Sequence, residues 1–429
     1  MTQAESTRAP RIPLEPVEGW YGADPEDPAH LDDPHPGFKQ LREQQPVNRT
    51  PWGGWRVSRY DDCVRVLKEI PAGMRLTNGK LPGEPDADPN SGQPSFMLLQ
   101  DPPAHTRLRK LVSKAFTPRA VESWRPRIQA ITDDLLDAVA ERGEMDLIAD
   151  LALPVPSTLI CELLGVPVED RDRFTRWTAD ATHGLVTRRG ESPPELVERV
   201  ERARMGLAGY FTGLIEERRG QARNDLLSVL IAADETGDKL NPGELLVQCI
   251  GLLIAGFETT IGLIGNGLTT LIQHPAELAR LRAQPALIES AVEECLRYSG
   301  PILMTVRVLH AEAEIGGVRL PADAEVTIVT AAANRDPSRY VDPEKFDVAR
   351  WTTKPAPPPH LAFGGGVHFC LGAHLARLET QIAIGSLVSR FDDLKLLNER
   401  TKWGRSLFRV PESVPISFRA RSDRGAAPA

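Results

Sequence analysis

The chain has 429 residues and a hydrophobic content of 41%, which is enough to bury a large core. Its 59 acidic side chains outnumber its 51 basic ones, and no long basic run is present, which argues against nucleic acid as the main partner. The 5 cysteines are widely spaced and form no Cys-x-x-Cys pair, which argues against a disulfide framework, a zinc ribbon and covalent heme attachment.

The two ends of the chain are expected to fray. Residues 1–18 and 422–429 are polar or Pro-bearing, and the amino end lacks the apolar core of a signal peptide. We expect a single folded unit at 19–421 between two disordered tails. The missing signal peptide and the scattered cysteines favour a cytoplasmic location.

Helical signals dominate the chain from its amino end onward. Apolar spacing or good helix formers predict helices, in chain order, at 62–69, 103–116, 120–142, 193–219, 241–273, 286–298 and 371–391. Clusters of β-branched residues between turns predict strands at 55–57, 305–310, 317–320 and 325–330. The sequence therefore predicts a mainly α protein with a minor β component, and no internal repeat is visible.

One predicted helix has an apolar core, 245–272, that is long enough to span a bilayer. Glu258 lies at its middle, with Gln248 and Asn266 on either side, and basic anchors at its ends are missing. Because a carboxylate is costly in lipid, we interpret the segment as a buried helix that lines a site.

The segment 80–95 is rich in Pro, Gly and Asp and should lack regular structure. Loops of this length are often lids over binding sites, but a disordered insertion has the same composition. The sequence leaves both interpretations open.

The strongest chemical signal is a loop around Cys370, with three consecutive glycines before it. Glycines let a backbone approach a flat ligand or take a positive φ. A cysteine near a helix start gains thiolate character from backbone N–H groups. The residues alone also permit a zinc site with His368 and His374, or a nucleophilic cysteine–histidine pair.

The same loop resembles the cysteine-loop pattern of the cytochrome P450 family, Phe-x-x-Gly-x-x-x-Cys-x-Gly. The matching residues are Phe363, Gly366, Cys370 and Gly372. The resemblance implies the P450 fold in one domain and a heme b cofactor, with Cys370 as the axial iron ligand and Phe363 beside its sulfur. An iron-bound thiolate favours cleavage of the O–O bond.

The sequence Ala-Gly-Phe-Glu-Thr-Thr, which begins at Ala255, resembles the family's oxygen-activation motif. Gly256 would leave room for dioxygen where the helix passes over a porphyrin. Glu258 and Thr259 form an acid–alcohol pair that can relay the two protons needed to split dioxygen. A buried helix with one satisfied carboxylate is the alternative, and Thr260 is interpreted as a structural neighbour.

Glu294 and Arg297 match the family's Glu-x-x-Arg motif, and Arg350 would be the third member of the cluster. The resemblance implies a structural role in fixing the cysteine loop. The spacing alone is uninformative, because it also occurs in pairs that we interpret as solvated helix faces. These pairs are Glu122–Arg125, Glu201–Arg204, Glu216–Arg219 and Glu277–Arg280.

Heme would bring two buried propionates, which need cations or hydrogen-bond donors. His105 and Arg109 resemble the family's His-x-x-x-Arg helix. Arg307 and His368 also match propionate partners in the family. The cofactor-binding set implied by the resemblance is completed by Ala255, Gly256 and the motif residues of the cysteine loop.

The resemblance covers residues 20–419 and implies a monooxygenase that activates dioxygen and inserts one oxygen atom into an organic molecule, mainly by C–H hydroxylation. It also implies a separate ferredoxin with an NAD(P)H-dependent reductase, and a monomeric enzyme. An acidic ferredoxin is expected to dock near Arg107, Lys110, Lys114 and Arg377.

The family segments that face substrate contain mostly apolar residues here, so a small, largely apolar substrate is expected. These residues are Phe96, Met97, Leu253, Ile302, Leu303, Met304, Leu407 and Phe408. A peroxide-using heme enzyme, a non-catalytic heme sensor and a zinc or thiol hydrolase remain as alternatives. The acid–alcohol pair argues against the first, and the roomy oxygen helix argues against the second.

Overall fold

The computed structural model describes residues 32–50, 53–83, 94–183, 193–223, 225–235, 240–398, 400–404 and 408–421. The tails predicted at 1–18 and 422–429, most of the loop predicted at 80–95, and Leu407 lie outside these residues.

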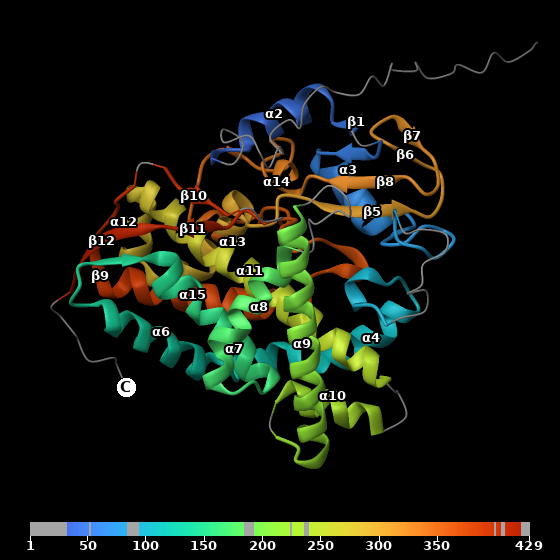
Figure 1. Ribbon diagram of the computed structural model, residues 1–429. Helices are drawn as coiled ribbons and strands as arrows, with labels where there is room; N and C mark the ends of the chain where they lie inside the picture. The colour runs from blue at the N-terminus through green and yellow to red at the C-terminus, as the bar shows by residue number, and fades with distance from the viewer. Residues whose placement is uncertain are drawn as a thin grey trace, which may run out of the picture.

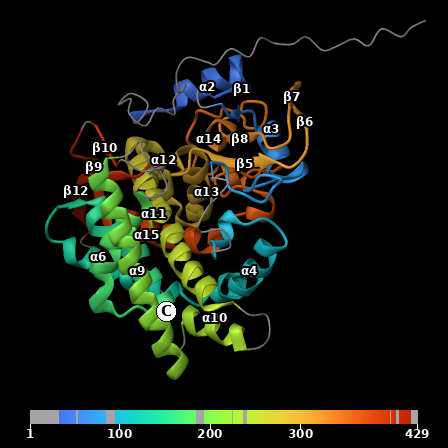
Figure 2. The same cartoon turned by 45° about the vertical axis from the view of Figure 1, so that its right-hand side comes forward.

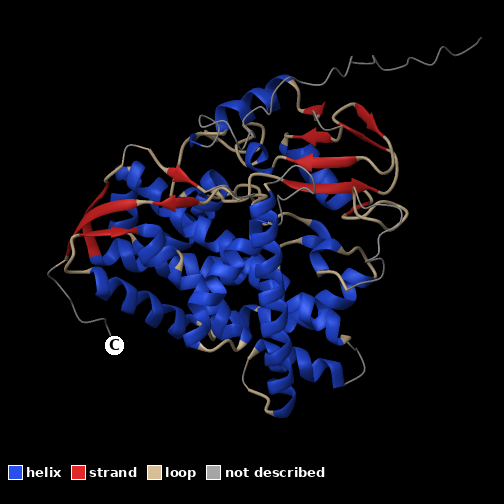
Figure 3. Ribbon diagram, in the orientation of Figure 1, coloured by secondary structure: helices blue, strands red, loops and turns tan. Residues whose placement is uncertain are grey.

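The described chain is mainly helical, as the sequence predicts, and the helices gather on one side of the molecule (Figures 1 and 3). The helices are α2 (His35–Gln44), α3 (Tyr60–Val64), α4 (Ala104–Ser113), α5 (Pro118–Glu122), α6 (Arg125–Val139), α7 (Pro154–Leu164), α8 (Arg171–His183), α9 (Pro194–Gly220), α10 (Leu226–Glu235), α11 (Pro242–Gln273), α12 (Pro275–Ala283), α13 (Ile288–Ser299), α14 (Thr330–Ala333) and α15 (Ala373–Arg390).

The strands form several small sheets. They are β1 (Val47–Arg49), β2 (Trp55–Val57), β3 (Ala72–Gly73), β4 (Glu144–Asp146), β5 (Thr305–Leu309), β6 (Ala313–Ile315), β7 (Val318–Leu320), β8 (Glu325–Ile328), β9 (Phe391–Leu396), β10 (Lys402–Trp403), β11 (Pro411–Ser413) and β12 (Pro415–Ala420).

The largest sheet has the strand order β1-β2-β8-β5-β3. Strand β2 pairs with β8 in parallel, with Trp55 opposite Val326, and the other pairings are antiparallel. A second sheet, β4-β12-β9, joins the carboxyl end of the chain to its first third. Figure 2 shows the largest sheet with α2 and α3 beside it, at one end of the helical body.

Helix α11 runs through the centre of the helical body and packs against α7, α8, α9, α13 and α15. Its start is fixed by a capping box between Asn241 and Glu244, with Pro242 in the first turn. By length and composition it could cross a membrane, yet 56% of its most apolar window is buried inside the protein. The position of α11 among its neighbours accounts for that apolar composition.

The apolar core is divided into two main clusters. The larger one is built on α6, α7, α11, α13 and α15 and extends from Met97 to Phe418. The smaller one lies on the largest sheet and includes Trp55, Val326 and Leu361. The segment that carries Cys370 follows Leu361 directly, so it begins at the edge of the smaller cluster.

Two predicted elements differ from the observed ones. The helix expected at 120–142 is two helices, α5 and α6, because Pro126 has no N–H with which to continue a helix through Ser123 and Trp124. The strand expected at 325–330 ends at Ile328, and Thr330 begins α14. The other predicted helices and strands agree with the structure to within a few residues at their ends.

Candidate functional site

The loop before α15 folds back on itself and presents Cys370. The N–H of Cys370 donates to the carbonyl of Phe363 at 3.0 Å, and the N–H of Phe369 donates to the carbonyl of Gly366 at 3.1 Å. Gly366 has φ +66°, and a Cβ at this position would lie 2.1 Å from the carbonyl oxygen of Leu67. Glycine is therefore required here, both for the backbone conformation and for the close approach.

The sulfur of Cys370 is subject to opposing influences. Burial raises the pKa of the thiol, whereas a hydrogen bond from the N–H of Gly372 and the charges of Arg109 and Arg377 lower it. Burial dominates, so the helix-start donors alone do not produce the thiolate that the sequence favoured. A bound cation would stabilise the deprotonated sulfur, since metal binding displaces the proton of a thiol.

Two histidines and an arginine from separate elements lie in or beside this loop. The rings of His105, on α4, and His368, in the loop, are 4.3 Å apart between centroids. Burial lowers the pKa of Arg307, on β5, to about 10, and burial together with Arg307 and His105 lowers the pKa of His368 to about 4. The three side chains therefore form a buried group in which Arg307 is charged, whereas the lowered pKa of His368 leaves that ring neutral at neutral pH.

The ring nitrogens of this group lack hydrogen-bond partners. Nδ1 of His105 and both ring nitrogens of His368 are buried without such a partner among the residues that the structure describes. Buried polar atoms in proteins are nearly always satisfied, so ring N–H groups left open beside the buried guanidinium of Arg307 fit a ligand that carries carboxylates. Arg109 is placed differently from these three residues, because its Nη2 donates to the carbonyl of Phe369 at 2.6 Å and ties α4 to the cysteine loop.

The middle of α11 has a face that other side chains leave uncovered. Ala255 is exposed, although Leu253 and Phe257 on either side of it are buried. A Cβ added to Gly256 would meet only Ile160, at an ordinary contact distance of 3.6 Å. The hydroxyl of Thr259 donates to the carbonyl of Ala255 at 2.9 Å, which draws it into the hydrogen-bond ladder of its own helix.

These features fit a heme. A cysteine sulfur that could bind iron, a helix face open to a flat ligand, and buried ring nitrogens for two carboxylates are the groups that such a cofactor needs. The cysteine loop leads into α15, which packs directly against α11.

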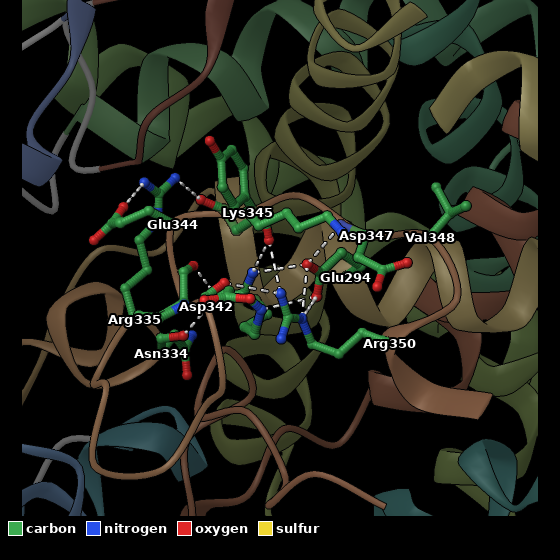
Figure 4. Close-up of polar contacts among 12 residues, drawn as sticks. Glu294, Asn334, Arg335, Asp342, Glu344, Lys345, Asp347, Val348 and Arg350 are labelled. Atoms are coloured by element: carbon green, nitrogen blue, oxygen red, sulfur yellow. Dashed lines mark hydrogen bonds and ion pairs between the residues drawn. The ribbon is translucent and has the colours of Figure 1, made fainter. Parts of the chain in front are cut away.

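Glu294, Arg297 and Arg350 form a buried ionic cluster (Figure 4). Both guanidinium groups contact the Glu294 carboxylate, Arg297 at 2.7 Å and Arg350 at 3.0 Å. Their remaining donors bind backbone carbonyls, including those of Asn334 and Lys345. The cluster therefore fastens the chain between α14 and the cysteine loop to α13.

A second contact extends this connection to the cysteine loop, because the side-chain oxygen of Asn334 accepts the N–H of Leu361 at 2.7 Å. Of the other pairs with the same spacing, Glu122–Arg125 and Glu201–Arg204 lie on exposed helix faces, as expected. Glu277–Arg280 was wrongly interpreted as a solvated pair, because the Glu277 side chain is only 17% exposed and accepts the N–H of Val348 at 3.0 Å, and Arg280 donates to Asp347.

Sequence reasoning missed a network behind the cysteine loop. The backbone N–H of Ala362 donates to Nδ1 of His360, so Nε2 carries the proton and donates to Glu293 at 3.1 Å. Burial alone would raise the pKa of Glu293, but its bonds from His360 and Arg377 lower it to about 2. Arg377 also covers the ring of Phe363, with its guanidinium carbon 4.6 Å from the ring centroid.

Asp101 was also missed as a site residue. Its carboxylate accepts the N–H groups of Met74 and Arg75 at 2.8 and 3.0 Å. It lies 3.7 Å from Nε2 of His368. A carboxylate therefore lies beside the buried histidines of the site.

The expected substrate-facing residues fall into two groups. Met97 and Leu253 are buried in the larger core cluster, and Met97 is fastened to α11 by a bond from its N–H to Gln248. Phe96 is partly exposed and lies against α11, where a Cβ on Gly251 would come within 2.2 Å of its ring. The remaining described members are also partly exposed, namely Ile302, Leu303, Met304 and Phe408.

Comparisons with known proteins agree over most of the chain. The cytochrome P450 family model matches residues 82–405. Cytochrome P450 107B1 of Saccharopolyspora erythraea is 41% identical and covers 91% of this chain and 96% of its own, and cytochrome P450 monooxygenase PikC of Streptomyces venezuelae is 41% identical with 92% and 93% covered. Among solved structures, P450BioI in complex with acyl carrier protein ligated by hexadec-9Z-enoic acid has a TM-score of 0.81 at 37% identity, over 91% of this chain and 99% of its own.

Proposed function

Because the chain belongs to the cytochrome P450 family and is a heme-dependent monooxygenase, we propose that it hydroxylates C–H bonds of a small, largely apolar organic molecule. The proposal rests mainly on the open face of α11 at Ala255. An apolar substrate and dioxygen would meet the heme against this face. The partly exposed apolar residues Phe96, Ile302 and Phe408 support a substrate of low polarity.

In this proposal the thiolate of Cys370 would bind the iron, and the backbone N–H of Gly372 would share the negative charge of the sulfur. His105, Arg307 and His368 would hold the heme carboxylates, and Arg109 joins α4 to the loop. Heme, when bound, supplies the reductive activation of dioxygen.

The protons would come from α11. The hydroxyl of Thr259, now bonded to the carbonyl of Ala255, would turn from that acceptor toward the open face of α11 and donate a proton there, and Glu258, the preceding residue, would reload it. The pair would hold and pass protons while the apolar surroundings exclude bulk water. The need for such a relay disfavours a peroxide-using enzyme or a passive sensor.

The decisive experiment replaces Cys370 by serine. Purified Cys370→Ser, reduced and exposed to carbon monoxide, should lack the red-shifted Soret band of a thiolate complex, because an alcohol does not replace the sulfur. The matched control is Cys63→Ser, since Cys63 is buried on α3 and points its sulfur at the carbonyl of Val57. A red-shifted band that survives in Cys370→Ser would refute the assignment.

We further propose that electrons come from a separate ferredoxin in the cytoplasm and that the enzyme is a monomer. Lys110 on α4 and Lys114 directly after it are exposed, and Arg107 and Arg377 bind Glu244 and Glu293. Lys110→Glu and Lys114→Glu should therefore slow reduction by an acidic ferredoxin more at low salt than at high salt. Unchanged rates across salt concentrations would contradict this docking site.

The substrate can be sought by screening compounds for spin-state shifts of the ferric protein, with turnover by surrogate redox partners as the second step. Turnover would exclude a heme sensor. A compound that shifts the spin state but yields no oxygenated product would count against C–H hydroxylation of that compound.

A further inference from the structure

We infer that Asp101 is a positioning residue that aims the ring of His368 at the heme carboxylates. This inference rests on the proposed heme site, but it concerns a residue outside the donors assigned there. The carboxylate of Asp101 lies between the segment after β3 and the cysteine loop, and it contacts both.

The backbone holds this carboxylate in a fixed orientation. Its Oδ1 accepts the N–H of Met74 at 2.8 Å and its Oδ2 accepts the N–H of Arg75 at 3.0 Å. Two directed bonds leave the side chain little rotational freedom. Oδ1 then lies 3.7 Å from Nε2 of His368, and Oδ2 lies 3.6 Å from Nε2 of His310.

The neighbouring strand leaves space for the carboxylate. A Cβ on Gly73 would lie 2.4 to 2.5 Å from the oxygens and the carboxyl carbon of Asp101. No side chain fits there without displacing Asp101. Asp101 can therefore occupy its position only because residue 73 is a glycine.

Asp101 also acts on the charges of the site. Arg109 and Arg307 bring positive charge to the site, and in the described part of the chain Asp101 is the negative group that acts on His105, His368 and Arg307 alike. Because its fixed carboxylate attracts a ring N–H of His368 across 3.7 Å, Asp101 can orient that ring. A ring positioned in this way loses less freedom when it binds a carboxylate.

The test is a double-mutant cycle read by heme release into excess apomyoglobin. Asp101→Asn preserves shape but removes the charge and one of the two acceptors, and it should accelerate release about tenfold, because the His368 ring loses the charged neighbour 3.7 Å from its Nε2. In a His368→Ala background the same change should have little further effect, because the group being positioned is gone. Equal acceleration in both backgrounds would overturn the inference, and so would no acceleration in Asp101→Asn.

A matched control separates positioning from mere fastening of the loop. Asp323 also binds the segment after β3, through the N–H and hydroxyl of Thr77 at 2.6 and 2.7 Å, but it is exposed and is not among the groups acting on His368. Asp323→Asn should leave heme release unchanged. If it matched Asp101→Asn, the effect would come from the loop and not from Asp101.

The reduction potential supplies a readout that loop fastening alone does not move. Removing a negative charge beside the heme should shift the ferrous-to-ferric ratio at a fixed potential severalfold toward ferrous in Asp101→Asn but not in Asp323→Asn. An unshifted ratio in Asp101→Asn would contradict the inference. If Asp101→Asn fails to fold, Gly73→Ala, which displaces the carboxylate, should give the same accelerated release and the same dependence on His368.

Failure here is distinguishable from failure of the proposed function. If the heme-thiolate assignment is wrong, the unmodified protein lacks the thiolate spectrum. If only the role of Asp101 is wrong, that spectrum is intact and the cycle is additive.

Discussion

Glu379 lies on α15, the helix that follows Cys370, with its side chain 3% exposed and its Oε2 without a hydrogen-bond partner. Burial is the cause that raises its pKa, to about 8. At neutral pH the carboxyl is therefore mainly protonated in the folded protein, although it would be ionised in the unfolded chain. A carboxyl of this kind makes stability depend on pH.

We expect Glu379→Gln to change that dependence. Because the folded pKa lies above the unfolded one, Glu379 increasingly destabilises the fold as pH rises from about 4.5 to about 8, and the loss reaches about 3 kcal/mol near pH 7. Denaturant titration measures the free energy of unfolding. The difference in this free energy, Glu379→Gln minus wild type, should therefore increase as the pH rises across this window. The exposed Glu314→Gln is the control, and a difference that does not vary with pH would contradict the prediction.

The sequence predicts those site residues that lie within a few positions of one another in the chain. The cysteine loop and the Ala255–Thr260 stretch carry their residues within a few positions, so a short pattern indicates them. The contact of Asp101 with His368 and that of Glu293 with His360 join residues far apart in the chain, and the latter pair is separated by 67 positions. No local pattern specifies such contacts, because only folding brings the partners together.

At the scale of elements, burial decides what an ion pair contributes. Glu294 and Arg297 on α13 have side chains that are 0% exposed, whereas Glu201 and Arg204 on α9, at the same spacing, are about half exposed. Breaking a buried pair leaves an uncompensated charge, but an exposed pair is screened by water and salt.

We therefore expect Glu294→Gln to lower the free energy of unfolding by about 3 to 5 kcal/mol, since two buried guanidinium groups lose their common partner. Glu201→Gln should cost less than about 1 kcal/mol. Denaturant unfolding of the heme-loaded protein measures both values. Similar losses for the two variants would show that the cluster does not hold the chain before the cysteine loop.

Several elements escaped prediction from the sequence, and each did so for a different physical reason. Helix α7 is buried on nearly every face, so its apolar residues show no helical period. Strand β9 reads Phe-Asp-Asp-Leu-Lys-Leu, and its charges are tolerated because it lies at the edge of the β4-β12-β9 sheet. Strands β3 and β10 have two residues each, too few for a pattern.

For the whole molecule, the division of the core into two clusters is the main feature. The helical cluster contains α11 and α15, and the sheet cluster contains β2 and β8. The candidate heme site lies between them: Gly366 touches Leu67 of the sheet cluster, whereas Phe363 packs against the helical one. Arg307 on β5 and His105 on α4 reach the same site from opposite sides of this division.

A ligand that contacts both clusters should couple their unfolding. Such a ligand binds only when both clusters are folded, so its binding free energy opposes the unfolding of either one. In protein produced without heme, we expect amide hydrogen exchange to be faster in β2 and β8 than in α11 and α15, since the sheet cluster is smaller and opens separately. Heme loading should reduce this difference at least tenfold by protecting the strands most. Strands and helices that exchange together without heme, or a difference that heme leaves unchanged, would mean that the two clusters are already one cooperative unit.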